Sequence, residues 1–305
     1  MGHLDGNVIV VTGAGGGIGR EHALLFAREG AQVVVNDYGG DSKGNAGTSE
    51  AADKVVAEIT AAGGSAVADA HDVALDGAAV VRTALDTFGG LHGVVNNAGI
   101  SGGGGLDEIP AEAYQRMLDI HLGGTLAVTR AAWPILKEQG YGRVVITSSA
   151  SVFGLPHTSA YITAKAALFG LTRALSKEGK HHDIKVNAIM PAAYSRLTAQ
   201  SPEFSALMEA SFPPSHIAPF VGALLSRDAP VNGETFVVGG GRAARVVLAT
   251  TPGHISNGTI DGWLAEFDQV MASDDLLVPR DANDEVVIEC QQLGIDLSKF
   301  WGNAG

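Results

Sequence analysis

The chain has 305 residues, of which 46% are hydrophobic and 17% charged, and its formal charge is −13. This length fits one large α/β domain or two small ones, with enough apolar residues to bury a sizeable core. The acidic balance argues against a surface for nucleic acid or anionic membrane, and the single cysteine, Cys290, excludes an internal disulfide and argues against cysteine-held zinc.

Short apolar runs alternate with stretches of helical spacing. In chain order they predict strand 8–11, helix 20–29, strand 32–36, helix 49–62, strand 65–70, helix 78–88, strand 93–96, helix 111–139, strand 142–147, helix 161–179, and strands 184–189 and 234–238. Strands separated by helices imply parallel pairing, and strands that are apolar throughout imply burial on both faces. The sequence therefore predicts an α/β fold with a doubly wound, mainly parallel, seven-stranded Rossmann-like sheet.

The strand–helix rhythm stops near the end of the last predicted strand. We expect residues 1–244 to form the catalytic domain and residues 245–305 to be an acidic C-terminal extension packed on it. Trp263, Phe267 and Trp301 favour packing over the alternative of a flexible tail, since disordered tails seldom carry such residues. Because we find no leader peptide and no apolar run of membrane-spanning length, we expect a cytoplasmic protein that contacts neither nucleic acid nor membrane.

A glycine-rich loop follows the first strand and has the pattern T-G-x-x-x-G-x-G. Glycines there allow a tight turn and close approach of a pyrophosphate, which the N-terminus of the next helix would stabilise. A plain strand–helix turn is the alternative. The candidate cofactor-binding residues of the loop are Gly13, Gly15, Gly16, Gly17, Ile18 and Gly19.

Asp37 lies at the end of the second predicted strand, 24 residues after Gly13. A carboxylate at that place can accept hydrogen bonds from both hydroxyls of an adenosine ribose, and it would repel the extra phosphate of NADP. A solvated loop acid is the alternative. Together with the loop, Asp37 predicts NAD as the cofactor, and we expect no metal.

Tyr161 and Lys165 are four residues apart, so they share one face of a helix. The pKa of a free tyrosine is about 10, which is too high for proton transfer at neutral pH. A lysine cation one turn away, joined by the positive charge of nicotinamide, is expected to lower that pKa and make Tyr161 an acid/base. A tyrosine and a lysine four residues apart are common by chance. The pair indicates an acid/base role because it lies after the fifth predicted strand.

Hydroxyl side chains end the fifth predicted strand, at the sheet edge where such folds bind ligands. A serine there can hydrogen-bond and polarise a substrate oxygen. Ser148 and Ser149 are both candidates.

Taken together, these motifs resemble the short-chain dehydrogenase/reductase family over about residues 5–240. The motifs that carry the resemblance are Thr12–Gly19, Asp72-Val73, Asn96–Gly99, Ser148-Ser149, Tyr161-x-x-x-Lys165 and Val186–Pro191. The resemblance implies that Asp72 and Val73 flank the adenine, and that Asn97, Ala98 and Gly99 line the cofactor floor. It also implies that Lys165 holds the nicotinamide ribose, and that the segment carrying Pro191, Ala193, Ser195 and Thr198 faces the nicotinamide amide.

Two positions need separate comment. The family usually has asparagine, on a helix bulge, where this chain has His121, and a histidine there could hold a water, relay protons or change its charge near neutral pH. Its alternative is a purely structural role. Ser148 has the usual spacing of 13 residues before Tyr161, whereas the serine motif itself aligns Ser149, which we favour as the catalytic serine.

A closer resemblance is to the (3R)-hydroxyacyl-CoA dehydrogenase unit of peroxisomal multifunctional enzyme type 2 and its bacterial relatives. It rests on Val35–Asp41, Ala51–Val56, His121–Thr125, Thr129–Trp133 and Ser195–Thr198. It implies a 3-hydroxyacyl-CoA substrate, a place in lipid metabolism, and a homodimer or homotetramer built on the helices near 111–139 and 161–179. A hydroxysteroid or general secondary-alcohol dehydrogenase, and a catalytically silent NAD(H)-binding redox sensor, remain alternatives. Apolar residues between 199 and 219 suggest either a substrate cover or ordinary core packing.

Overall fold

A computed structural model describes the chain except for residues 1, 41–46, 195–201, 257, 273–274 and 296–305. The chain divides into two compact units, Met1–Arg245 and Val246–Gly305. The packing of the extension on the catalytic domain stays a prediction.

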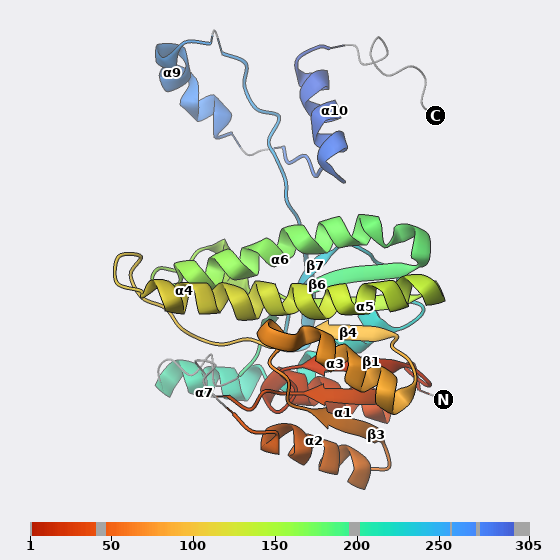
Figure 1. Cartoon of the computed structure of the whole chain (residues 1–305). Coiled ribbons are helices and arrows are strands. Elements are labelled where there is room, and N and C mark those ends of the chain that lie inside the picture. The colour runs from red at the N-terminus through yellow and green to blue at the C-terminus, as the bar shows by residue number, and fades with distance from the viewer. Residues whose placement is uncertain (1, 41–46, 195–201, 257, 273–274, 296–305) are drawn as a thin grey trace. The chain divides into compact units, whose positions relative to one another are not determined.

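The first unit is built on one sheet of eight strands in the order β3-β2-β1-β4-β5-β6-β7-β8 (Figure 1). The strands are β1 (Val8–Thr12), β2 (Gln32–Asn36), β3 (Ser65–Asp69), β4 (Gly93–Asn96), β5 (Gly142–Thr147), β6 (Ile184–Ala192), β7 (Thr235–Gly239) and β8 (Arg242–Val246). All pairs from β3 to β7 are parallel. The order reverses between β1 and β4, and such a switch point opens a crevice at the carboxyl ends of the strands.

The predicted doubly wound, mainly parallel, Rossmann-like sheet is confirmed, with one strand more than the seven expected. Strand β8 follows β7 through the two-residue turn Gly240-Gly241, whose φ angles of +56° and +80° are those that a tight hairpin requires. The strand escaped prediction because its sequence, Arg-Ala-Ala-Arg-Val, is polar and partly exposed, as an edge strand tolerates.

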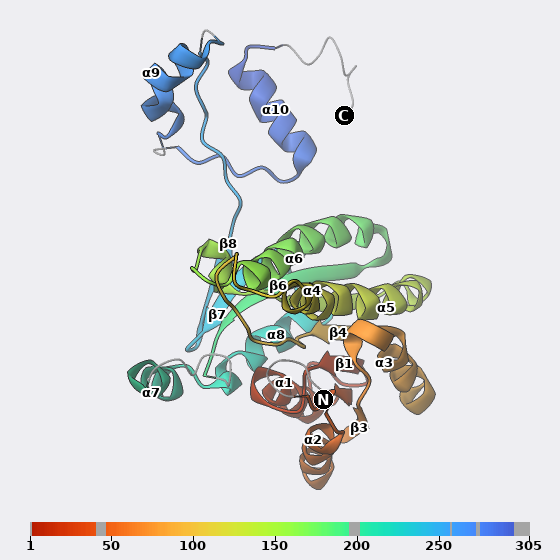
Figure 2. The same ribbon diagram turned by 60° about the vertical axis from the view of Figure 1, so that its left-hand side comes forward.

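Helices cover both faces of the sheet, as Figures 1 and 2 show. Alternate residues of a strand pack on opposite faces of the sheet. In β1, Ile9 and Val11 pack with α1 (Gly17–Arg28) and its neighbours, whereas Val8 and Val10 pack on the other face. The first face also holds α2 (Glu50–Ala61) and α8 (Ala218–Leu225). The second holds α3 (Val73–Phe88), α5 (Thr125–Gln139) and α6 (Ser159–Glu178). The double-sided burial explains why the strands are apolar throughout.

The long predicted helix 111–139 is continuous, but its middle is wound differently. It consists of α4 (Ala111–Leu118), a π-helical segment η1 (Asp119–Gly124) and α5. A π-helical turn rotates the side chains that follow it relative to an ordinary helix, and it often marks a functional site. His121 lies within this segment.

Several elements were not predicted. In the first unit these are η2 (Ala150–Phe153), η3 (Lys180–His182), α7 (Pro202–Ser211), η4 (Pro214–His216) and α8. The second unit contains α9 (Ile260–Val270), α10 (Ala282–Gln292) and an antiparallel bridge between Thr250 and Leu277. None of the helices in the described part of the chain combines the length and the apolar character that a membrane crossing needs.

Candidate active site

A cavity of about 440 Å³ lies at the carboxyl edge of the sheet. Its walls come from the residues that follow β4, β5 and β6, from η1 and α6, and from the first turn of α1. The predicted site residues among its lining are Ile18, Asn97, Gly99, His121, both candidate serines Ser148 and Ser149, Tyr161, Lys165, Pro191 and Ala193. Ser195 and Thr198 lie outside the described residues.

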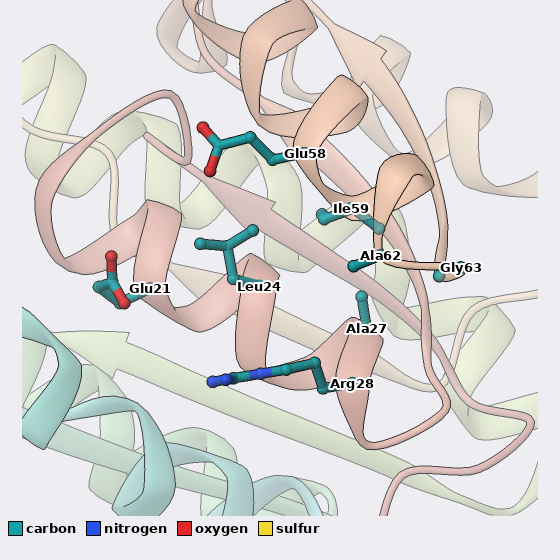
Figure 3. A pocket seen from close by; sticks show the side chains of 9 residues that line it. Glu21, Leu24, Ala27, Arg28, Glu58, Ile59, Ala62 and Gly63 are labelled. Atoms are coloured by element: carbon teal, nitrogen blue, oxygen red, sulfur yellow. The ribbon is translucent and has the colours of Figure 1, made fainter.

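A second hollow, of about 470 Å³, lies between α1 and α2 (Figure 3). Its floor includes Leu24 and Ile59, and its charged lining residues are Glu21, Arg28 and Glu58. It contains none of the predicted site residues, so the cavity at the sheet edge is the candidate active site.

Ser149, Tyr161 and Lys165 meet in the cavity. The Ser149 hydroxyl donates to Oγ of Ser151 at 3.1 Å, and it lies close enough to the Tyr161 phenol to lower the pKa of that phenol. The Lys165 ammonium lies 5.7 Å from the centre of the Tyr161 ring and donates to the carbonyl oxygen of Thr147 at 2.6 Å. The buried Ser148 hydroxyl instead donates to the carbonyl oxygen of Lys165 at 2.8 Å. The geometry therefore favours Ser149 as the catalytic hydroxyl and gives Ser148 a structural task on α6.

Burial affects the electrostatics of this pair. Burial raises the pKa of Tyr161 above its ordinary value, and the Ser149 hydroxyl opposes part of that rise. Burial also lowers the pKa of Lys165 to about 7. Burial of both side chains opposes the expected lowering of the Tyr161 pKa, and the lowering by Lys165 together with nicotinamide stays a prediction.

His121 is almost fully buried, at 1% exposure, and its ring meets the Tyr161 ring edge-on at 5.2 Å. Its Nε2 lies 2.9 Å from the carbonyl oxygen and 3.2 Å from the N–H of Ile100, so it donates to the first in one tautomer and accepts from the second in the other. Burial, aided by the charge of Lys165, lowers the pKa of His121 well below its ordinary value. The lowered pKa favours the neutral imidazole and argues against a change of charge near neutral pH, which was one of the possibilities that the sequence left open.

Two buried polar atoms at the cavity lack partners among the described residues. They are Nδ1 of His121 and Oγ1 of Thr147. Nδ1 is an acceptor in the tautomer in which Nε2 donates to the Ile100 carbonyl oxygen, and a donor in the tautomer in which Nε2 accepts from the Ile100 N–H. Unpaired buried groups are costly, so their presence at one cavity indicates a place where a ligand or water is bound. Gly99 is required beside them, since a Cβ there would overlap the His121 ring.

The glycine loop fits a pyrophosphate. A Cβ at Gly13 would lie 2.8 Å from the Cα of Ala98, so this glycine allows close packing, and its φ is +64°. Gly16 and Gly17 instead face open space. Helix α1 begins there with no side-chain cap, which leaves its first N–H groups available to an anion.

Asp37 lies beside this loop, as predicted. Its Oδ2 accepts from the N–H of Gly15 at 2.7 Å, and its Oδ1 accepts from the N–H of Gly39 at 2.8 Å. Each oxygen keeps further acceptor capacity. The carboxylate is therefore fixed next to the open glycines, where an adenosine ribose would follow a pyrophosphate.

Asp72 and Val73 begin α3. Asp72 caps this helix by accepting from the N–H of Ala74 at 2.8 Å, and its other oxygen pairs with Arg116 at 2.8 Å. Val73 is buried. These contacts give Asp72 a structural role beside the predicted adenine role, and they add Arg116, which the sequence analysis did not single out.

The segment after β4 is tied to the glycine loop. The side-chain amide of Asn97 donates to the carbonyl oxygens of Thr12 and Gly13, at 3.1 Å each. The Thr12 hydroxyl accepts from the N–H groups of Asn97 and Ala98, at 3.0 Å each. Thr12 was part of the loop motif but received no role in the sequence analysis. Its position at the end of β1, next to β4, is the signal that could have identified it.

The chain matches the family model described as short chain dehydrogenase over residues 7–204. It is 46% identical over 248 residues to a short-chain type dehydrogenase/reductase of Mycobacterium tuberculosis, covering 80% of this chain and 86% of the relative. It is also 46% identical over 254 residues to peroxisomal multifunctional enzyme type 2 of Mus musculus, covering 83% of this chain but only 34% of that enzyme, so it spans about a third of the mouse protein. Carveol dehydrogenase from Mycobacterium avium in complex with NAD superposes with a TM-score of 0.70 at 27% identity, covering 78% of this chain and 97% of that one.

Proposed function

The chain belongs to the short-chain dehydrogenase family, and from that premise we propose that it interconverts a secondary alcohol and a ketone with NAD(H). The observation that carries the proposal is the meeting of Ser149, Tyr161 and Lys165 in a cavity that also includes Ile18 of the first turn of α1. A hydroxyl, a phenol and a buried lysine form a proton-transferring group, and the loop beside them fits a dinucleotide.

The residues that would hold NAD come from separate elements. The open turn at Gly16 and Gly17 would take the pyrophosphate and Asp37 the adenosine ribose, while Gly99 and Pro191 would border the nicotinamide. When bound, oxidised nicotinamide supplies a hydride acceptor and a positive charge. The NAD complex of the structurally similar carveol dehydrogenase supports the choice of cofactor.

The protein's own groups then divide the proton chemistry. Ser149 holds the substrate oxygen by a hydrogen bond and polarises it. Tyr161 accepts the hydroxyl proton of the alcohol during oxidation and returns it to the oxygen during reduction. A positive charge near the phenol lowers its pKa against the effect of burial, and Lys165 contributes such a charge when it is protonated.

We propose a 3-hydroxyacyl-CoA as the substrate, in keeping with the resemblance to the dehydrogenase unit of peroxisomal multifunctional enzyme type 2. The 46% identity to the mouse enzyme supports this choice. An apolar lining residue supports it as well: Leu155 lines the cavity and is 46% exposed. An exposed apolar side chain in the lining of a cavity suits an apolar substrate body.

The test is NADH formation by the wild type and Tyr161→Phe. The panel contains 3-hydroxyacyl-CoA chains of several lengths, a 17β-hydroxysteroid and simple secondary alcohols. We expect turnover with the acyl-CoA chains, loss of turnover in Tyr161→Phe, and nearly unchanged NADH binding in that variant, measured by fluorescence. Substantial turnover in the variant refutes the role of Tyr161. Preference for the steroid or for simple alcohols refutes the substrate, and binding without any turnover indicates a redox sensor.

We also propose that the chain forms a homodimer or homotetramer through α5 and α6. Ala166, Ala167 and Gly170 of α6 are exposed small residues, which allow close approach of a second helix. Light scattering after size exclusion is expected to give twice or four times the mass of one chain, and a monomer contradicts the proposal.

A further inference from the structure

A buried carboxylate lies outside the cavity and takes no part in the proposed proton transfer. Asp69 is the last residue of β3, and its side chain is 1% exposed. Its oxygens accept from the Asn36 amide at 2.6 Å, from the Thr83 hydroxyl at 2.6 Å, and from the His71 N–H and Nδ1 at 3.1 and 2.9 Å. Donors from β2, α3 and the turn before α3 therefore converge on one carboxylate.

The network leads directly to Asp37. The N–H of Asp37 donates to the carbonyl oxygen of Asp69 at 2.9 Å. Asn36, which precedes Asp37, also donates its amide to the carbonyl oxygen of His71 at 3.0 Å. The carbonyl oxygen of Asn36 accepts from the N–H of Ala14 in the glycine loop at 2.8 Å. Asp69 thus fixes both the residue that carries the ribose carboxylate and a neighbour that holds the loop.

Asp69 is ionised at neutral pH. Burial raises its pKa, but hydrogen bonds from Thr83, His71 and Asn36 outweigh burial and hold the pKa below its usual value. A buried charge is retained at low cost only when its acceptor sites are satisfied, and such a network fixes the positions of its members. Among the described residues, the side chain of the half-exposed Asp37 accepts hydrogen bonds from the N–H groups of Gly15 and Gly39 alone. Its place therefore depends on the strand end that Asp69 holds.

We propose that Asp69 is a positioning residue for the adenosine subsite, holding Asp37 where it selects NAD over NADP. The inference rests on the proposed function, because it takes Asp37 as the acceptor for the ribose hydroxyls. Asp69 itself contacts neither the cavity nor the predicted ribose carboxylate side chain. Its effect reaches the cofactor only through the ends of β2 and β3.

The test compares two variants of this network with a matched control. Asp69→Ala removes the shared acceptor, and Thr83→Val removes one donor with almost no change in shape. Thr60→Val is the control, since Thr60 on the neighbouring α2 donates only to its own helix, to the carbonyl oxygen of Val56 at 2.9 Å. For each protein, NADH affinity is measured by fluorescence, kcat and KM are measured with NAD and NADP, and Tm is recorded.

We expect Asp69→Ala to raise the NADH Kd and the KM for NAD on the order of tenfold, with kcat within twofold of wild type. In the same variant, we expect the ratio of kcat/KM with NAD to kcat/KM with NADP to fall. Thr83→Val should raise the NADH Kd and the KM for NAD by about threefold, and Thr60→Val should change neither. If Asp69→Ala does not fold, the comparison of Thr83→Val with Thr60→Val decides.

Unchanged NADH affinity in folded variants overturns the proposal, as does a fall in kcat and Tm without a change in affinity. The outcome for the proposed function is separate. A wild type that binds no dinucleotide refutes both proposals, whereas a wild type that binds NADH with a Kd equal to that of the variants refutes only the role of Asp69.

Discussion

Strand β5 has a buried cation near each of its ends, and the two cations differ in their hydrogen-bond partners. Near the amino end, Arg143 is 1% exposed and donates to the carbonyl oxygens of Gly142, Asp183, Ser226 and Arg227 at 2.7 to 3.1 Å. It also stacks on Tyr141, 4.3 Å from the ring centre. At the carboxyl end, Lys165 is 4% exposed, and the hydrogen bond from its ammonium is to Thr147.

The contrast separates a structural end of the sheet from a functional one. Arg143 has its fixed fork of donors satisfied by carbonyl oxygens, so its burial holds the loops around the amino edge together. Lys165 has a pKa of about 7 and shares its cavity with the unpaired atoms of His121 and Thr147. A buried polar group left unpaired next to a cavity lowers the stability of the fold. A ligand that forms a hydrogen bond with such a group recovers that free energy when it binds.

Replacing Lys165 is expected to have the largest effect. Lys165→Met removes the charge that favours the Tyr161 phenolate, so kcat/KM should fall by ~10²–10⁴ while the protein stays folded. Steady-state kinetics and circular dichroism check this. Lys54→Met, which removes an exposed lysine paired with Glu50, is the control and should leave kcat/KM unchanged. A fall of less than tenfold for Lys165→Met would show that the lysine does not assist Tyr161.

Replacing Arg143 should affect stability in place of activity. Arg143→Met removes a buried side chain and its hydrogen bonds to four carbonyl oxygens, one bond buried and three part-buried, so the free energy of unfolding should fall by about 3 kcal/mol. Urea denaturation measures the loss, and kcat/KM of the folded protein should match wild type. Arg82→Met, which breaks an exposed pair with Asp76, should cost less than about 0.5 kcal/mol. A selective loss of kcat/KM in Arg143→Met would contradict the division between the two ends.

The pH dependence of stability distinguishes Lys165 further. Because its pKa is lowered from 10.5 to about 7, the unfolded chain holds a proton between these values that the folded chain has lost. Wild type should therefore gain stability relative to Lys165→Met as pH rises from 7 to 9, by roughly 1 kcal/mol per pH unit. Below pH 7 both states hold the proton, and the difference should be flat. Parallel curves across pH 7 to 9 would mean that the lysine is not desolvated in the fold.

The strands were predictable to within a few residues because burial on both faces requires an unbroken apolar run. Such a run can be read from the hydrophobicity of each residue. Helix α1 was placed three residues late because its first turn is formed by glycines, whose low helix propensity conceals it. The π-helical segment η1 was missed, since the chain continues as a helix on both sides and only a hydrogen-bond shift distinguishes it.

The candidate site was predictable where it depends on spacing and not where it depends on burial. The pair of Tyr161 and Lys165 follows from a helical repeat. The serine motif already favoured Ser149, and the structure adds that the Ser148 hydroxyl donates to the carbonyl oxygen of Lys165. The pKa directions of Tyr161 and His121 depend on desolvation by distant segments, which no local pattern contains. The role of Asp69 requires strands that are far apart in the sequence.

His22 gives the smallest expected effect and tests whether an unpaired buried group alone indicates function. It lies on the core face of α1, stacked on Phe26, and within the described residues neither ring nitrogen has a partner. Burial lowers its pKa to about 3, so the folded chain resists the proton that the unfolded chain takes up below pH 6.5. Wild type should lose about 1 kcal/mol relative to His22→Leu as pH falls from 7 to 5.5, measured by urea denaturation. Activity should be equal in the two proteins, because His22 is not part of the cavity lining. A drop in kcat for His22→Leu would mean that unpaired buried groups mark function even away from the cavity, and the contrast between the two ends of β5 would then lose its basis.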